Sequence, residues 1–100
     1  MSQIQLDRYV VEVLMPDLIG HDRSAAAFAV YLFLWSKCAA TGRSQISYAT
    51  IATETGLSKA GAQRAIAALR SRKLVSSRKT SPTSVPEYRV ARPWLRALRG

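Results

Sequence analysis

Apolar residues recur at intervals of three and four along residues 25–40, which is the spacing of one face of a helix. The apolar stripe of this stretch consists of Phe28, Leu32, Trp35 and Ala39, flanked by Tyr31 and Cys38. Ser24 precedes it as an N-capping residue, and Thr41-Gly42-Arg43 follows it with a glycine where a helix end favours left-handed backbone. We therefore expect residues 25–40 to form the longest helix, with this stripe facing the core.

Residues 7–20, DRYVVEVLMPDLIG, carry their apolar side chains in adjacent pairs. The pairs are Val10 and Val11, Leu14 and Met15, and Leu18 and Ile19, and their separation by four residues suits a helix. Three valines and Pro16 also suit a strand that ends before the proline. The pattern favours a kinked helix over 7–20, and a strand over 7–15 is the alternative.

Two shorter helices are each introduced by a serine that can cap them. Ser47 precedes residues 48–55, whose inward residues are Ile51 and Ala52, and Gly56 ends this helix. Ser58 then precedes residues 59–73, in which one side carries Ala62, Ile66 and Leu69. We expect two helices joined by a tight turn.

Short extended segments surround these helices. Residues 44–46 can pair as a minimal strand, and residues 74–79 and 87–91 alternate as two strands. The loop between them, 80–86, contains two prolines, which makes it a long hairpin connection. Pro93 suits the first position of a helix, so residues 92–100 are expected to form a short helix or tail.

Charge is distributed unevenly along the 100 residues, whose formal net charge is +9. Residues 1–55 hold four basic and five acidic residues, whereas residues 56–100 hold eleven Lys or Arg against Glu87 alone. The two halves therefore carry −1 and +10. A segregated positive half is typical of proteins with a polyanionic partner, nucleic acid before anionic membrane.

Few residues are suited to chemistry. Cys38 is the single cysteine and excludes an intramolecular disulfide, and His21 stands in a charged turn without the neighbours in sequence that a metal site needs. No grouping for acid–base, nucleophilic or phosphate-loop chemistry occurs, so we expect neither an enzyme nor a cofactor or metal. Apolar runs are too short to span a bilayer and no secretory signal is visible, which indicates a cytoplasmic protein.

The expected order of elements is helix, short strand, helix, glycine turn, helix and basic hairpin. With the motif IATETGLS at 51–58 and the KLV that leads into the first strand of the hairpin, it resembles the winged helix-turn-helix DNA-binding domain of bacterial transcriptional regulators of the MarR and GntR type. The resemblance covers residues 24–90 and is sharpest over 47–75. It implies a mainly α fold with a small β wing (α+β): a three-helix core, a two- or three-stranded hairpin and an extra N-terminal helix.

The domain organisation follows from this resemblance. Residues 1–23 are expected to be an N-terminal extension that holds a dimerisation helix, residues 24–91 the winged helix-turn-helix domain, and residues 92–100 a C-terminal helix or tail. One reading helix recognises only a few base pairs, so we expect a homodimer on a two-fold repeated site. Its contacts would come from residues 7–20, with Trp94 and Leu98 as further candidates.

The side of helix 59–73 away from its apolar residues is made of small and polar groups. Small residues such as Ala60, Gly61 and Ala67 would let the helix approach base edges, Gln63 suits adenine and Arg64 suits guanine. The candidate base-reading residues are Lys59, Ala60, Gln63, Arg64 and Ala67. The alternative is that this side is ordinary solvated surface rich in alanine, a strong helix former.

Contacts with the DNA backbone are expected from helix starts, from the end of helix 59–73 and from the wing. The candidates are Ser47, Tyr48, Ser58, Arg70, Arg72, Lys73, Arg78, Lys79 and Arg89. Cations at 70–73 would also stabilise a helix C-terminus, and charges on the hairpin would also protect a sheet edge. The function favoured by these residues is sequence-specific binding of double-stranded DNA in transcriptional regulation. A plasmid or phage replication initiator, an architectural DNA-binding protein and a winged-helix protein-interaction module are the alternatives.

Overall fold

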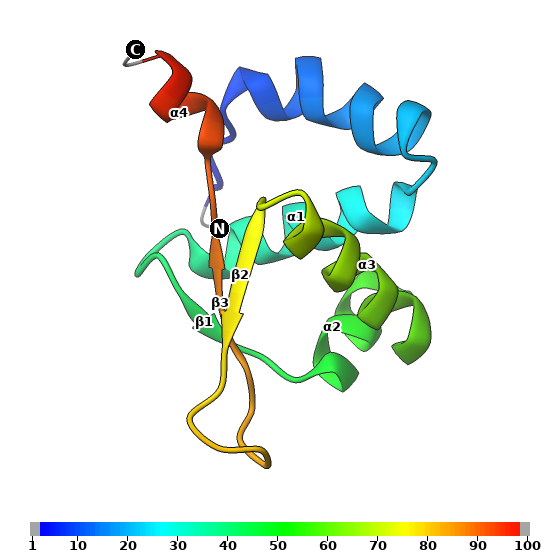
Figure 1. The fold of residues 1–100 in the computed structure, drawn as a ribbon, viewed down its shortest axis with the longest axis vertical. Helices are drawn as coiled ribbons and strands as arrows, with labels where there is room; N and C mark the ends of the chain where they lie inside the picture. The colour runs from blue at the N-terminus through cyan, green and yellow to red at the C-terminus, as the bar shows by residue number, and fades with distance from the viewer. Residues whose placement is uncertain (1–2, 99–100) are drawn as a thin grey trace.

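The computed structural model describes the backbone of residues 3–98 and the side chains of residues 3–95 (Figure 1). The chain forms, in order, two π-helical stretches, a helix, a short strand, two helices, two strands and a last short helix. These elements are η1 (Val10–Leu14), η2 (Pro16–His21), α1 (Ala25–Cys38), β1 (Ser44–Gln45), α2 (Tyr48–Thr55), α3 (Lys59–Ser71), β2 (Val75–Arg78), β3 (Glu87–Val90) and α4 (Pro93–Leu98).

The N-terminal segment is helical, so the alternative of a strand over residues 7–15 is wrong. Its turns are wide: the Met15 N–H donates to the carbonyl of Val10, five residues earlier, and the Asp22 N–H donates to that of Asp17 at 2.9 Å. Pro16 begins η2, where its missing N–H costs little. One face of η1 and η2 enters the core through Val10, Leu14 and Leu18.

Helix α1 is the centre of the fold, and η2, α2, α3 and β3 pack around it (Figure 1). Ser24 caps it as expected, because its Oγ accepts the Ala27 N–H at 3.1 Å. The expected apolar stripe is only partly correct, since Ala39 is exposed and Leu32 and Trp35 are half-buried. Neighbours on several sides bury a wider set instead, namely Ala27, Phe28, Val30, Tyr31, Leu34 and Cys38.

Helices α2 and α3 form the expected pair around a glycine turn. Ser47 and Ser58 cap them, with their Oγ atoms accepting the N–H of Thr50 at 3.1 Å and of Gly61 at 2.9 Å. Gly56 adopts φ +79° between the helices, a left-handed conformation that glycine enters at little cost. Helix α3 stops at Ser71, two residues earlier than expected, because Lys73 turns into the left-handed region at φ +60°.

The strands form one antiparallel sheet in the order β1-β3-β2. Tyr88 at its centre pairs with Ser44 on β1 and with Ser77 on β2. Alternation places Val75, Ser77, Tyr88 and Val90 on the face toward α1. Three helices with a small three-stranded sheet confirm the expected fold class, a winged helix-turn-helix with additional N-terminal helix.

The N-terminal segment is fastened to the rest of the chain near its C-terminal end. Arg92 donates two hydrogen bonds to Asp7, of 2.8 and 2.7 Å, and the indole N–H of Trp94 donates a third at 2.9 Å. Tyr9 stacks on Trp94 with ring centroids 4.6 Å apart. The first and last described elements therefore close the fold together, across the side of α1 away from the hairpin loop (Figure 1).

Candidate nucleic-acid interface

Helix α3 divides cleanly into a buried and an exposed side. The buried side consists of Ala62, Ala65, Ile66 and Leu69, which pack against α1 and α2. All five candidate base-reading residues lie on the exposed side: Lys59, Ala60, Gln63, Arg64 and Ala67. None of their side chains forms a hydrogen bond or ion pair with another residue among 3–95, which leaves two cations, an amide and two methyl groups free for a partner.

Gly61 has a role in the helix cap besides the clearance for DNA expected of it. A Cβ built on this glycine would lie 3.0 Å from the Oγ of Ser58, the atom that accepts the Gly61 N–H. A larger residue would therefore displace the capping hydroxyl. The cap therefore gives this glycine a local reason, and Ala60 and Ala67 are the small residues that are fully exposed on this side of α3.

The cations expected to contact the DNA backbone fall into two groups. Arg70, Lys73, Arg78 and Lys79 are exposed and have no acidic partner among the described side chains. Arg89 is also exposed and lies 3.6 Å from the carboxylate of Glu87. These residues lie at the C-terminal end of α3 and on the hairpin. Positive charge therefore continues from α3 onto the hairpin.

Arg72, also expected to contact the backbone, differs from these cations because it has acidic partners in the chain. Its guanidinium donates to Asp22 at 2.7 Å and also to Asp17, both from the N-terminal segment. This contact lowers the pKa of Asp22 below its ordinary value of 3.8, chiefly through the hydrogen bond from Arg72. Arg72 therefore joins the end of α3 to η2, and two carboxylates of the same chain balance its charge.

The same contact assembles a cluster that sequence reasoning missed. Ligand atoms of Asp17, His21 and Asp22 all lie within 4.8 Å of one another, with the His21 Nδ1 3.5 Å from a carboxylate oxygen of Asp22. Arg72 binds both carboxylates and balances one of their two negative charges. Asp22 and Arg72 are 50 positions apart, and the sequence gives no signal of this pairing.

The three backbone candidates at helix starts occupy the positions expected of them. Ser47 and Ser58 act as N-caps, and Tyr48 is the first residue of α2, half-buried against the core. First-turn N–H groups of a helix lack partners inside it and attract anions. The starts of α2 and α3 therefore present donors beside the exposed side of α3.

A family model described as a helix-turn-helix domain matches residues 24–75, slightly more than half of the chain. The chain belongs to this helix-turn-helix family. The matched segment begins at the cap of α1 and ends at the first residue of β2, so it contains the whole of α2, the turn and α3. This identifies a helix-turn-helix DNA-binding domain.

A solved structure supports the fold of this helix-turn-helix protein. The chain is similar to Lactococcus lactis ZitR in the structure of its C30AH42A mutant in apo form, with a TM-score of 0.50 and 14% identity. The alignment covers 95% of this chain and 70% of that one, so it includes the N-terminal helices and the hairpin as well as the matched segment. A comparison with curated proteins finds no match.

Exposed apolar side chains of this helix-turn-helix protein gather on its N-terminal segment. Ile4, Leu6, Tyr9, Val11, Val13, Met15 and Ile19 are exposed there, whereas the only other large exposed apolar side chain among residues 3–95 is Val85 on the hairpin. In each apolar pair of this segment the first residue is buried and the second is exposed. The buried residues are Val10, Leu14 and Leu18, and the exposed ones are Val11, Met15 and Ile19. Trp94, expected as a further dimer contact, is buried, and the side chain of Leu98 lies outside the described residues.

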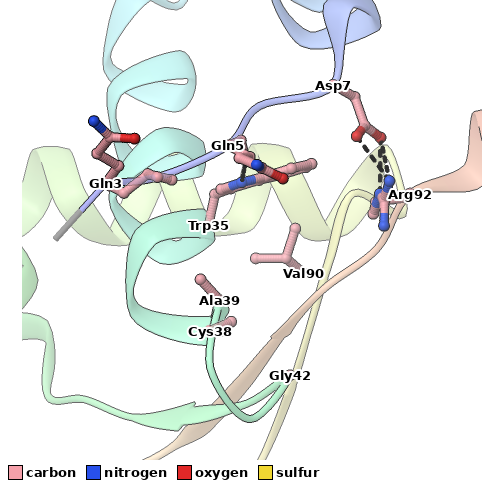
Figure 2. A pocket seen from close by; sticks show the side chains of 10 residues that line it. Gln3, Gln5, Asp7, Trp35, Cys38, Ala39, Gly42, Val90 and Arg92 are labelled. Carbon is pink, nitrogen blue, oxygen red and sulfur yellow. Dashed lines mark hydrogen bonds and ion pairs between the residues drawn. The ribbon is translucent and has the colours of Figure 1, made fainter.

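A cavity of about 600 Å³ lies under the first residues of the helix-turn-helix protein (Figure 2). Figure 2 shows Gln3 and Gln5 on one side of it, Trp35 and Cys38 of α1 on another, and the Asp7–Arg92 pair at its edge. The indole N–H of Trp35 donates to the carbonyl of Gln5 at 2.8 Å. Burial raises the pKa of the Cys38 thiol, as expected for a small apolar packing residue. None of the helices in residues 3–98 is sufficiently long and apolar to cross a bilayer.

Proposed function

We propose that the protein binds double-stranded DNA sequence-specifically as a transcriptional regulator. Helix α3 would read the major groove with Gln63 and Arg64, and the hairpin would contact the backbone or minor groove with Arg78, Lys79 and Arg89. The observation that carries this proposal is the exposed side of α3: small and cationic, without acidic partners among the described side chains, and continued by the cations of the hairpin.

We further propose that the protein acts as a homodimer through its N-terminal segment. Val11, Met15 and Ile19 form an outward apolar row along η1 and η2. The four acids of this segment form ion pairs within the chain with Arg8, Arg72 and Arg92. An uncharged apolar row on each copy is self-complementary, which a two-fold axis requires. Pairing would present two reading helices to a repeated site and add the specificity that one helix lacks.

The direct test is selection of duplexes from a random pool, followed by binding measurements in increasing salt. We expect an enriched two-fold site and an affinity that falls by about 10³ or more between 50 and 200 mM salt. Arg64→Ala and Gln63→Ala should reduce discrimination at their own bases by ~1–3 kcal/mol, whereas Arg78→Ala and Lys79→Ala should weaken all duplexes alike.

Two outcomes contradict the proposal. Equal affinity for all duplexes would exclude base reading, and weak salt dependence would favour a winged-helix protein-interaction module. Enrichment of origin-type repeats in place of promoter sites would leave DNA binding intact and assign the protein to replication initiation.

A further inference from the structure

Helices α1, α2 and α3 are each followed by a residue with left-handed backbone, and after α3 this residue is not a glycine. Gly42 follows α1 at φ +82° and Gly56 follows α2 at φ +79°, whereas Lys73 follows α3 at φ +60°. Left-handed backbone costs glycine almost nothing, but it brings the Cβ of any other residue too close to a backbone oxygen. A glycine at position 73 would therefore relieve strain, and the lysine calls for an explanation.

Hydrogen bonds on both sides hold Lys73 in this conformation. Its own N–H donates to the carbonyl of Arg70 at 3.0 Å, and the N–H of Leu74 donates to the carbonyl of Leu69 at 2.9 Å. Leu74 is buried, so the turn at Lys73 also brings the next residue into the core. The Lys73 side chain is exposed and has no acidic partner within residues 3–95. No ion pair of the fold therefore explains this lysine.

Lys73 lines an open hollow of about 300 Å³ between the end of α3 and strand β2. The residues around it are Arg70, Lys73, Val75, Ser76, Ser77 and Ala91. Arg70 is exposed as well, and it also lacks an acidic partner among the described side chains. The lining thus holds two unpaired cations and two serines, and it contains no carboxylate.

Strand β2 lies at an edge of the sheet, and its free edge adds hydrogen-bond donors to this hollow. The Ala91 N–H donates to the carbonyl of Leu74 at 2.8 Å, which makes these residues a hydrogen-bonded pair at the end of the β2–β3 ladder. Such pairs alternate along an antiparallel ladder, so Val75 and Ser77 turn their backbone N–H groups away from β3. Both residues line the hollow, where these N–H groups supplement the cations.

We propose that this hollow binds one phosphate of the DNA backbone, and that position 73 carries a lysine because its ammonium group contacts this phosphate. Arg70 shares the phosphate with Lys73, and the Ser77 N–H and the serine hydroxyls donate hydrogen bonds to it. The inference rests on the proposed DNA binding and adds to it a defined phosphate site between the reading helix and the hairpin. Backbone strain at Lys73 accompanies this placement of charge, as it does at many binding sites.

Lys73→Gly tests the proposal through two opposite effects. Relief of the left-handed strain should raise the melting temperature by about 2–6 °C. Loss of the ammonium group should lower the affinity for every duplex sequence by about three- to tenfold at roughly 100 mM salt. If the lysine served only to stabilise the C-terminus of α3, the same variant would lower the melting temperature and leave DNA binding unchanged.

Arg23→Gly is the matched control, because Arg23 is the other non-glycine residue with left-handed backbone in the described part of the chain, at φ +54°. It is an exposed arginine between η2 and α1 and does not line the hollow. This variant should also raise the melting temperature, and it should leave DNA affinity unchanged. Lys73→Arg keeps a cation on the same backbone, so both its melting temperature and its affinity should stay close to those of the wild type.

A combination of Lys73→Gly with Arg70→Ala tests whether the two cations share one phosphate. The slope of log K against log salt reports the number of phosphates that the protein neutralises, so the double variant should reduce it by about one for each bound subunit. Separate phosphates for the two cations would give a reduction of about two for each subunit.

Any of three results would overturn the inference while leaving the proposed function in place. The first is a Lys73→Gly variant whose melting temperature does not rise, and the second is a Lys73→Gly variant with wild-type DNA affinity. The third is a double variant whose slope corresponds to two lost phosphates for each subunit. Failure of the proposed function is recognised separately, because the wild-type protein would then bind no duplex.

Discussion

The N-terminal segment and the region from α3 to the hairpin expose opposite kinds of surface. Residues 3–22 show apolar side chains to solvent, and their acids bind cations of the same chain, with Asp7 on Arg92 and Asp17 and Asp22 on Arg72. Residues 59–90 bury their large apolar side chains except Val85, and they expose cations, of which Arg72 binds Asp17 and Asp22 and Arg89 lies near the carboxylate of Glu87.

This difference separates the partners that each region suits. An apolar surface gains most from another apolar surface, whereas unpaired cations gain most from a polyanion. The contrast also shows that the net charge overestimates the number of cations that are free to bind a partner. Arg72 and Arg92 belong to the basic half by sequence, yet the fold uses both to attach the N-terminal segment.

The largest effect is expected from charge placed in the outward apolar row. Val11→Glu combined with Ile19→Glu should convert the dimer to a monomer, because like charges would meet across the two-fold axis. Affinity for a repeated site should fall by about 100-fold or more through lost bivalency. Sedimentation and duplex binding measure both effects. Ala40 is exposed outside the row, so Ala40→Glu is the control. A double variant that stays dimeric would contradict the proposed interface.

An intermediate effect should separate the two kinds of cation. Arg72→Ala should lower the free energy of unfolding by about 1 kcal/mol, since it breaks two partly exposed ion pairs, and lower the melting temperature by about 4–8 °C. Its salt slope for DNA binding should stay unchanged. Arg78→Ala should keep the melting temperature and reduce the slope by about one. If Arg72→Ala instead reduced the salt slope and Arg78→Ala lowered the melting temperature, the roles assigned to these two arginines would be wrong.

The smallest effect is expected from acid. The pKa of Asp22 is lowered by the hydrogen bond from Arg72, and that of Asp7 is lowered because hydrogen bonds from Arg92 and Trp94 outweigh burial, which acts to raise it. Both carboxylates stabilise the fold above their unfolded pKa, near 3.8, and this contribution is lost as the pH falls through the lowered values. Thermal unfolding between pH 7 and 2.5 should show the decline, and Asp22→Asn should make it shallower. If the decline of stability with pH in Asp22→Asn matched that of the wild type, Asp22 would not be one of the carboxylates that cause it.

Features set by neighbouring residues could be predicted from the sequence. The caps at Ser24, Ser47 and Ser58 each depend on an N–H three residues away, and Gly56 ends α2 by its own conformational freedom. The division of α3 into an apolar and a small polar side follows from helical periodicity. The candidate base-reading residues could therefore be named from the sequence as residues of the exposed side of α3.

Features that join distant residues could not be predicted. Asp17 and Arg72 are 55 residues apart, and a charged residue in a last helical turn has several equally plausible partners. Residues 7–20 were ambiguous because both members of each apolar pair look alike in the sequence. Only packing against α1 decides that Val10 turns inward and Val11 outward.

The amino-acid sequence by itself determined the order of elements from α1 to β3, the ends of α1, α2 and α3 to within two residues, and the concentration of positive charge after residue 55, because these depend on local conformational preference and composition. The tertiary structure alone decided which of the described cations remain free, and that among the described residues the buried hydroxyl of Tyr31 has a hydrogen-bond partner and that of Tyr88 has none. Those properties depend on distances between atoms that the chain brings together only when its core closes around α1.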